Sequence, residues 1–117
     1  MAQLTITLVT ATIAKDETLS TPIDATTGRI DHIVVPGDWD PDTNITFQAS
    51  SDGVAYFNLY DSNGNEIMIG VVPGTMVKVG QHAIGGAWIK LRSGRHDADE
   101  NDTKQTGNRL FSIAIAT

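Results

Sequence analysis

The stretch HDADENDTKQTGNR, residues 96–109, holds the densest group of potential oxygen ligands in the chain. A calcium loop of the EF-hand type needs oxygen ligands at alternate positions, a glycine at the sixth position and a bidentate glutamate at the twelfth. Asp97, Asp99 and Asn101 fit the first, third and fifth positions. The sixth residue is an aspartate, the twelfth is an asparagine, and neither flank has a helical pattern. The EF-hand interpretation therefore fails. A solvated loop is the preferred interpretation, and an irregular calcium site at these three residues is the weaker alternative.

A second group of oxygen ligands lies in FNLYDSNGNEIMI, residues 57–69. Its carboxylates and amides could also contact calcium. Asn63-Gly64 stands between two alternating apolar runs, and this dipeptide is the strongest short-range signal for a β-hairpin. Because backbone geometry already explains these residues, we interpret the run as a plain hairpin. We therefore predict no cofactor for the chain.

Side chains that could act as nucleophiles, acids or bases form no recognisable catalytic pattern. The three histidines, His32, His82 and His96, are far apart in the sequence and match no metal-ligand spacing. The chain has no cysteine and no GxSxG segment, and its paired carboxylates fall in turns, where aspartate serves local hydrogen bonds. We predict no catalytic residues and no enzyme activity. His32 is expected on the same strand face as Ile30 and Val34, as a hydrogen-bonded histidine at the edge of the core.

The two tryptophans have different contexts. Trp88 lies in an alternating run, which predicts packing in the sheet core or against a neighbouring subunit. Trp39 lies between two aspartates in a proline-bounded loop. It is either an exposed contact or sugar-stacking residue, or an anchor that pins its loop to the end of the core. We favour the anchor because large aromatic side chains are rarely left fully exposed.

Strands must position these residues, because apolar side chains recur at every second position along most of the chain. No window has a sustained helical period. The alternating runs lie at residues 4–8, 28–35, 45–49, 54–60, 67–71, 75–79, 87–93 and 109–116. Turn-forming segments separate them at a spacing near ten residues. We predict one all-β domain over residues 1–117, an antiparallel β-sandwich, jelly-roll-like, with about eight strands. An extended N-terminal arm over residues 1–12 is an alternative for the first run.

Composition excludes some partners. The net charge is −6 and Lys and Arg number only 8, so the chain lacks the clustered positive charge that nucleic-acid binding requires. The start, MAQLTITLVT, has no cationic segment and alternates polar with apolar residues. We therefore expect neither a signal peptide nor a membrane span.

The order of four segments forms a recognisable pattern: ATIAKDETLSTPID, then RIDHIVVPGDWDPDTNITFQASSDGVAYFNLYDSNGNEI, then WIKLRSG and finally NRLFSIAI. This order, with a centre of the form hIVhP..W....hTFQhS.DG..h..LYD..G.E and an hKhRSG strand, resembles a group of small proteins encoded in tailed bacteriophages and prophages. The resemblance covers most of the chain. The matching residues are Ile33, Pro36, Trp39, Thr46, Phe47, Gln48, Ser50, Asp52, Gly53, Leu59, Tyr60, Asp61, Gly64, Glu66, Lys90, Arg92, Ser93 and Gly94.

The resemblance implies a structural protein of the virion, a β-sandwich that decorates or cements the capsid as a homotrimer, with the phage major capsid protein as its partner. No catalytic residues come with it. Members of the group have a shorter and less charged loop after RSG, so residues 95–108 look specific to this chain. An exterior position on the capsid is expected, because packaged DNA would repel an acidic surface.

Residue type and position indicate four interface candidates. Trp39 and Arg92 are candidate anchors because Trp and Arg are enriched in interface hot spots, and Leu4 and Ile6 are candidates because terminal strands readily contact neighbouring subunits. Two alternatives remain open. One is a component of the tail or of a head fibre. The other is a calcium-dependent carbohydrate- or receptor-binding β-sandwich module, which would use Trp39, Tyr60 or the acidic loop.

Overall fold

The computed structural model describes residues 5–40, 43–94 and 104–117. These segments contain strands and one short 3₁₀ turn, and no α-helix is found within them. The strands are β1 (Ile6–Ile13), β2 (Ile23–Val34), β3 (Ile45–Ser50), β4 (Phe57–Asn58), β5 (Met68–Ile69), β6 (Met76–Lys78), β7 (Gly85–Ser93) and β8 (Arg109–Ala116), and the 3₁₀ turn η1 spans Gly80–His82. The prediction of an all-β fold is confirmed.

The described strands form one open antiparallel sheet with the order β1-β8-β2-β7-β3-β4, in which β5 also pairs with β3 and β6 with β2. Strand β2 connects two parts of this sheet. Residues 23–25 and Arg29 pair with β7, and residues 29–34 pair with β8. The β2–β7 pairing shifts register between Ala25 and Arg29. Gly28 lies in this bend, where a Cβ would overlap the carbonyl oxygen of Ala116, so the chain needs a glycine there.

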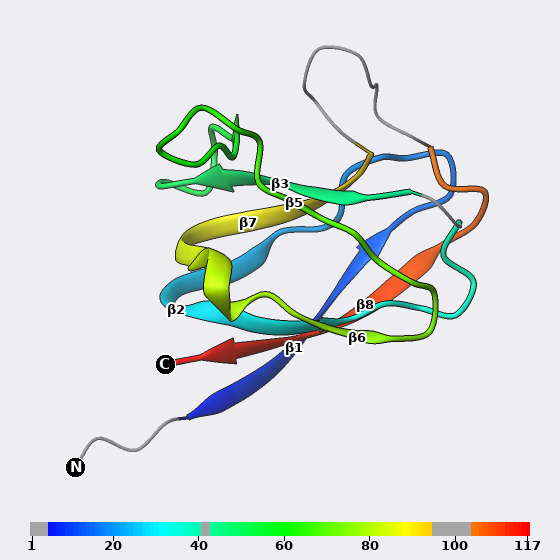
Figure 1. Ribbon diagram of the computed structural model, residues 1–117, viewed down its shortest axis with the longest axis horizontal. Coiled ribbons are helices and arrows are strands. Elements are labelled where there is room, and N and C mark those ends of the chain that lie inside the picture. The colour runs from blue at the N-terminus through cyan, green and yellow to red at the C-terminus, as the bar shows by residue number, and fades with distance from the viewer. Residues whose placement is uncertain (1–4, 41–42, 95–103) are drawn as a thin grey trace.

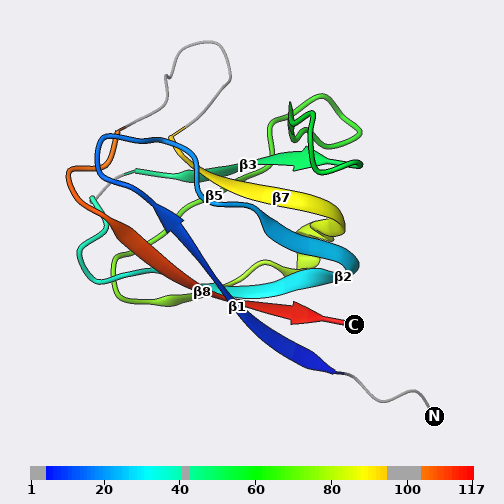
Figure 2. The same ribbon diagram turned by 180° about the vertical axis from the view of Figure 1, so that it is seen from behind.

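The sheet folds over on itself, so that β3 and β7 face β1, β8 and the second half of β2 (Figures 1 and 2). Isoleucines and aromatic side chains fill the space between the two layers. Trp39 and Phe111 meet there edge to face, with ring centroids 5.4 Å apart. This arrangement is compatible with the expected β-sandwich, although the layers belong to one continuous sheet.

A β-bulge in β2 places His32 on a different face from the one predicted from the sequence. Ile30 and Ile33 are both fully buried although they are three residues apart, and the pairing with β8 shifts register between Ile30 and His32. The extra residue reverses the alternation. His32 therefore does not share a face with Ile30, contrary to the prediction from a regular pleat. Its ring does make the expected hydrogen bond, because Nδ1 lies 2.8 Å from a carboxylate oxygen of Asp31.

Candidate interaction surface

Trp39 anchors its loop to the core. Its side chain is 2% exposed, and its Nε1–H donates a hydrogen bond of 2.9 Å to the carbonyl oxygen of Thr43. The prediction that the indole pins its loop is confirmed. The assignment of Trp39 as an interface anchor was wrong, because a side chain buried within its own subunit cannot contact a partner.

Arg92 is also buried, with 3% of its side chain exposed. It lies on the face of β7 opposite the core residue Leu91. The hairpin between β4 and β5 covers this face: Arg92 Nη1 lies 3.3 Å from the Glu66 carboxylate, and Nη2 donates to Asn58 Oδ1. Arg92 therefore fixes the hairpin to the sheet. Its assignment as an interface anchor was wrong for the same reason as that of Trp39.

The remaining predicted site residues have different outcomes. Ile6 lies on β1 with 44% of its surface exposed, so it stays a candidate for contact with a partner. The N-terminal arm over residues 1–12 is the alternative prediction. From Ile6 onward this segment forms β1, which pairs with β8 of the same chain. Leu4 and the three candidate calcium ligands, Asp97, Asp99 and Asn101, lie outside the described residues.

Charged side chains in the described part of the chain form local pairs. Asp31 accepts a hydrogen bond of 2.8 Å from Lys78 Nζ. This bond, together with the contact to His32, lowers the pKa of the Asp31 carboxyl below its ordinary value. Within the described segments, no group of three or more His, Cys, Asp or Glu side chains could hold a metal ion.

A second polar cluster surrounds Arg109, the first residue of β8. Its guanidinium pairs with Asp38 at 3.2 Å and with Asp40 at 3.1 Å, and its Nε–H donates to Gln105 Oε1 at 2.9 Å. Gln105 is fully buried and donates through Nε2 to Ser93 Oγ at 2.8 Å. The cluster ties the loop after β2 to the segment before β8. Both carboxylates are paired with Arg109, so we interpret the cluster as structural.

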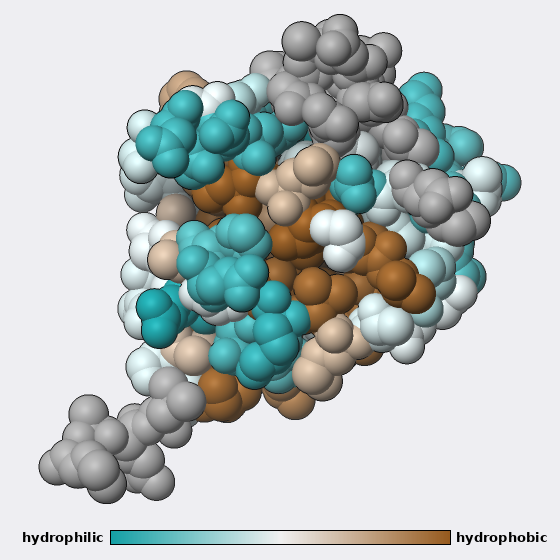
Figure 3. All heavy atoms as spheres, viewed as in Figure 1, coloured by the Kyte–Doolittle hydropathy of each residue, from teal (hydrophilic) through white to brown (hydrophobic). Residues whose placement is uncertain are grey.

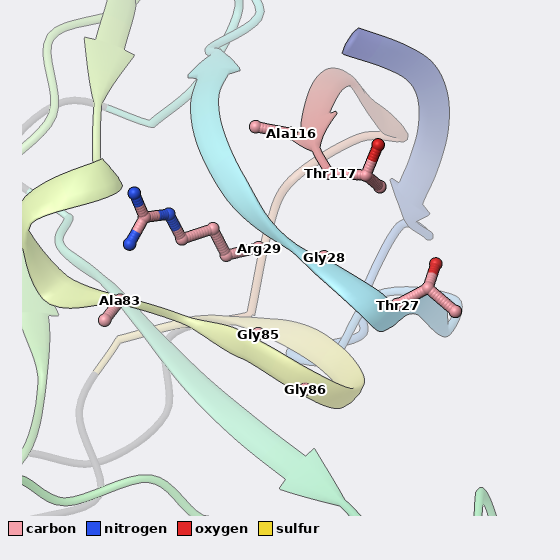
Figure 4. A pocket seen from close by; sticks show the side chains of 8 residues that line it. All are labelled: Thr27, Gly28, Arg29, Ala83, Gly85, Gly86, Ala116 and Thr117. Carbon is pink, nitrogen blue, oxygen red and sulfur yellow. The ribbon is translucent and has the colours of Figure 1, made fainter. Parts of the chain in front are cut away.

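An open hollow of about 450 Å³ lies beside the bend of β2 and the end of β8. Its lining is mostly backbone and small side chains, and Arg29 is its only charged residue among those described. Figure 4 shows the Arg29 side chain extending away from Thr27 and Thr117. The lining therefore has no convergent set of polar groups of the kind that orients a small ligand.

Two surfaces in the described part of the domain carry no charged side chain. The first is formed by residues 67–77, which contain β5 and most of β6; we refer to this segment as the β5–β6 strap. It has no charged residue. Met68, Val72 and Met76 are 40%, 63% and 57% exposed. In Figure 3, apolar atoms gather across the middle of the molecule, where Figure 1 places the strap. Exposed apolar patches of this kind mark surfaces for protein contact.

The second uncharged surface is the outer face of β1 and β8. Leu8 and Leu110 are exposed there. No residue from 5 to 14 or from 110 to 117 has a charged side chain. The alternating pattern predicts both strands, but only the fold shows that Leu8 and Leu110 are exposed to solvent. The strap is also an uncharged run in the sequence, where its alternation predicts only a strand.

No helix among the described residues is long and apolar enough to cross a membrane. No family model matches the chain, and neither a curated protein nor a solved structure shows a significant match.

Proposed function

We propose that this chain is a structural protein of a bacteriophage virion that decorates the outer surface of the capsid and stabilises the shell. Its partner is the phage major capsid protein, and it contributes binding surface rather than catalysis. The identity of the partner rests on the sequence resemblance described above. The mode of attachment rests on the surface of the folded domain.

The observation that carries the mode of attachment is the β5–β6 strap. Three large apolar side chains, Met68, Val72 and Met76, are exposed along it in a chain that has a net charge of −6. An acidic protein binds another protein most readily where its own surface is neutral, because desolvating unpaired charges is unfavourable. We therefore assign the strap as the contact with the capsid.

The net charge supports a position outside the shell. DNA binding needs phosphate neutralisation by Lys and Arg, and this chain has 14 acidic residues against 8 basic ones. An acidic domain inside the shell would be repelled by the packaged genome. On the exterior, the same charge favours solubility and keeps neighbouring particles apart.

The test is immunogold labelling of intact phage particles from the source culture with an antibody against this chain. We expect gold over the whole head. Gold confined to the tail would overturn the capsid assignment and favour the tail or head-fibre alternative. Absence of gold from intact particles would overturn a virion role and favour the carbohydrate-binding alternative, which calcium-dependent glycan binding would then test.

The trimer implied by the resemblance stays a prediction. The capsid assignment does not depend on it, because a decoration protein can bridge capsid subunits as a monomer or as an oligomer. The open edge of β1 instead favours pairs of copies, and the mass of the free chain in solution decides between the two stoichiometries.

A further inference from the structure

Strand β1 has one free edge. Thr5 and Thr117 exchange two backbone hydrogen bonds, of 3.5 and 3.0 Å, beside the β1–β8 ladder. In an antiparallel pair such hydrogen-bonded positions alternate, so the odd-numbered residues of β1 direct their N–H and C=O groups toward β8. The even-numbered residues Ile6, Leu8 and Thr10 direct theirs away from it.

The free edge has a defined end. Thr12 is also even-numbered, and both of its backbone groups are used: its N–H donates to Thr21 Oγ1 at 3.1 Å and its C=O accepts from the Thr21 N–H at 3.0 Å. Among the described residues, no strand and no hydrogen bond reaches the outer groups of Ile6, Leu8 or Thr10. Three donors and three acceptors thus form an open ladder that stops at Thr12.

The sequence of this edge is nearly symmetric about Leu8. The run TITLVTA, residues 5–11, has small or β-branched residues on both sides of the central leucine and no charge. If two such edges meet antiparallel with Leu8 opposite Leu8, then Ile6 faces Thr10 at both ends. Because Ile6, Leu8 and Thr10 all have outward N–H and C=O groups, every pair in this register can exchange both backbone hydrogen bonds.

Charge permits contact between copies at this edge. Two chains with a net charge of −6 each repel one another at most orientations. The β1 edge and the adjoining face of β8 carry no charged side chain, so two copies can approach there without placing acidic groups side by side. Natural proteins protect open edges with charged residues or proline, and this stretch of β1 has neither.

We propose that the occupant of this edge is a second copy of the chain, and that β1 pairs with β1 of that copy in antiparallel orientation about Leu8. The contact is isologous and closes with two subunits. It produces a continuous sheet in the order β8-β1-β1-β8, with the two Leu8 side chains adjacent on the outer face. The proposal does not rest on the capsid assignment, and it uses residues distinct from the β5–β6 strap.

The first measurement is the mass of the purified full chain by sedimentation equilibrium. We expect twice the subunit mass of 12.5 kDa. A monomer at the highest soluble concentration would overturn the proposal. A trimer would overturn it as well, because an edge of this kind is used up when two copies pair.

Cysteine variants test the register. The chain has no cysteine, so Leu8→Cys introduces a single thiol. In a hydrogen-bonded antiparallel pair the two Cα atoms are about 5.5 Å apart, which is within the range that a disulfide spans. Under mild oxidation Leu8→Cys should become a covalent dimer. Leu110→Cys is the matched control, since Leu110 is similarly exposed on the same face but is not on the free edge. Equal cross-linking of the two variants, or none in Leu8→Cys, would overturn the register.

Thr10→Pro tests the backbone ladder. Proline at this position removes an N–H that faces away from β8, so the intramolecular ladder should persist. The pair loses two hydrogen bonds between copies, and we expect the dimer dissociation constant to rise at least about tenfold. Far-UV circular dichroism checks the fold of the variant. An unchanged dissociation constant in a folded Thr10→Pro variant would overturn the role of the edge.

Discussion

Arg92 and Glu66 form an ion pair in which both side chains are nearly inaccessible, 3% and 1% exposed. The charges of such a pair have lost most of their hydration, so their mutual attraction mainly compensates for desolvation. The pair therefore acts as a positional constraint: it holds the hairpin between β4 and β5 over β7. Residue type suggested an interface arginine, whereas the structure assigns Arg92 to the interior of the subunit.

Removal of one partner of this pair tests the constraint. Glu66→Ala leaves Arg92 charged and buried, and we expect the free energy of unfolding to fall by about 3 kcal/mol. Urea denaturation measures this change. The double variant Glu66→Leu/Arg92→Met leaves no charge behind and should lose clearly less. An equal loss in the two variants would contradict the interpretation that the uncompensated charge causes the effect.

Asp52 organises the loop after β3. Its Oδ1 accepts hydrogen bonds from the backbone N–H groups of Val54, at 2.8 Å, and Ala55, at 3.0 Å. These bonds, with one from the Ser50 hydroxyl, favour the ionised carboxylate and lower its pKa below the ordinary value of 3.8. The loop is thus wound around a charged acceptor rather than extended as a strand.

The lowered pKa of Asp52 predicts a pH dependence. A carboxyl whose pKa is lower in the folded chain than in the unfolded chain contributes its full stabilisation above the unfolded value of 3.8 and loses it as the pH falls toward the folded value. Asp52→Asn should therefore weaken the dependence of the urea midpoint on pH below about 4. The measurement is the midpoint of wild type and variant from neutral pH to pH 2. Parallel curves would refute the assignment.

At the scale of elements, the strands beside β3 are shorter than their sequences indicate. The alternating run 54–60 forms only β4, two residues long, and the run 67–71 forms only β5, also two residues long. Both pair with the same edge of β3, at different positions. One edge of six residues cannot accommodate two long partners. The surplus residues form the projecting hairpin and the exposed strap.

The β5–β6 strap gives a direct test of the proposed capsid contact. Val72→Asp places a charge at a position that is 63% exposed. We expect the stability of the isolated protein to change by less than about 0.5 kcal/mol, whereas cosedimentation with phage particles that lack the protein should be lost. The control is Val54→Asp, because Val54 is 83% exposed and lies outside the strap. Loss of binding in both variants, or in neither, would contradict the assignment of the strap.

Deletion of the acidic residues 97–104 tests whether this segment is a solvated loop. Gln105 exchanges backbone hydrogen bonds with the segment after β1, accepting from Asp16 N–H at 2.9 Å and donating to Glu17 at 3.3 Å. Deletion of residues 97–104 leaves Gln105 and Arg109 in place. Because loop-closure entropy changes slowly with length, we expect the free energy of unfolding to change by no more than about 1 kcal/mol. Thermal unfolding measures it.

Calcium distinguishes the two interpretations of that segment. A solvated loop predicts the same thermal midpoint with calcium and with EDTA. Stabilisation by calcium that EDTA reverses, and that the deletion abolishes, would instead support the cation site at Asp97, Asp99 and Asn101.

At the scale of the whole molecule, the bend of β2 decides the architecture. By pairing with β7 through residues 23–25 and Arg29, and with β8 through residues 29–34, one strand belongs to both layers, and the sheet encloses a single core. The alternating pattern predicted about eight strands, and eight are found among the described residues. It did not predict that β2 pairs with both β7 and β8, because the bend of β2 depends on close backbone approaches such as that of Gly28 to Ala116.

The sequence by itself determined the class of fold, because side-chain alternation at period two is a local property that any buried sheet requires. It also determined the acidic charge and the turn at Asn63-Gly64. Only the tertiary structure decided that Trp39 and Arg92 are interior, that His32 faces away from Ile30, and that Leu8 lies on an open edge. Each of these facts depends on which distant segments come together, and burial and hydrogen-bond satisfaction are properties of those contacts rather than of the residue type.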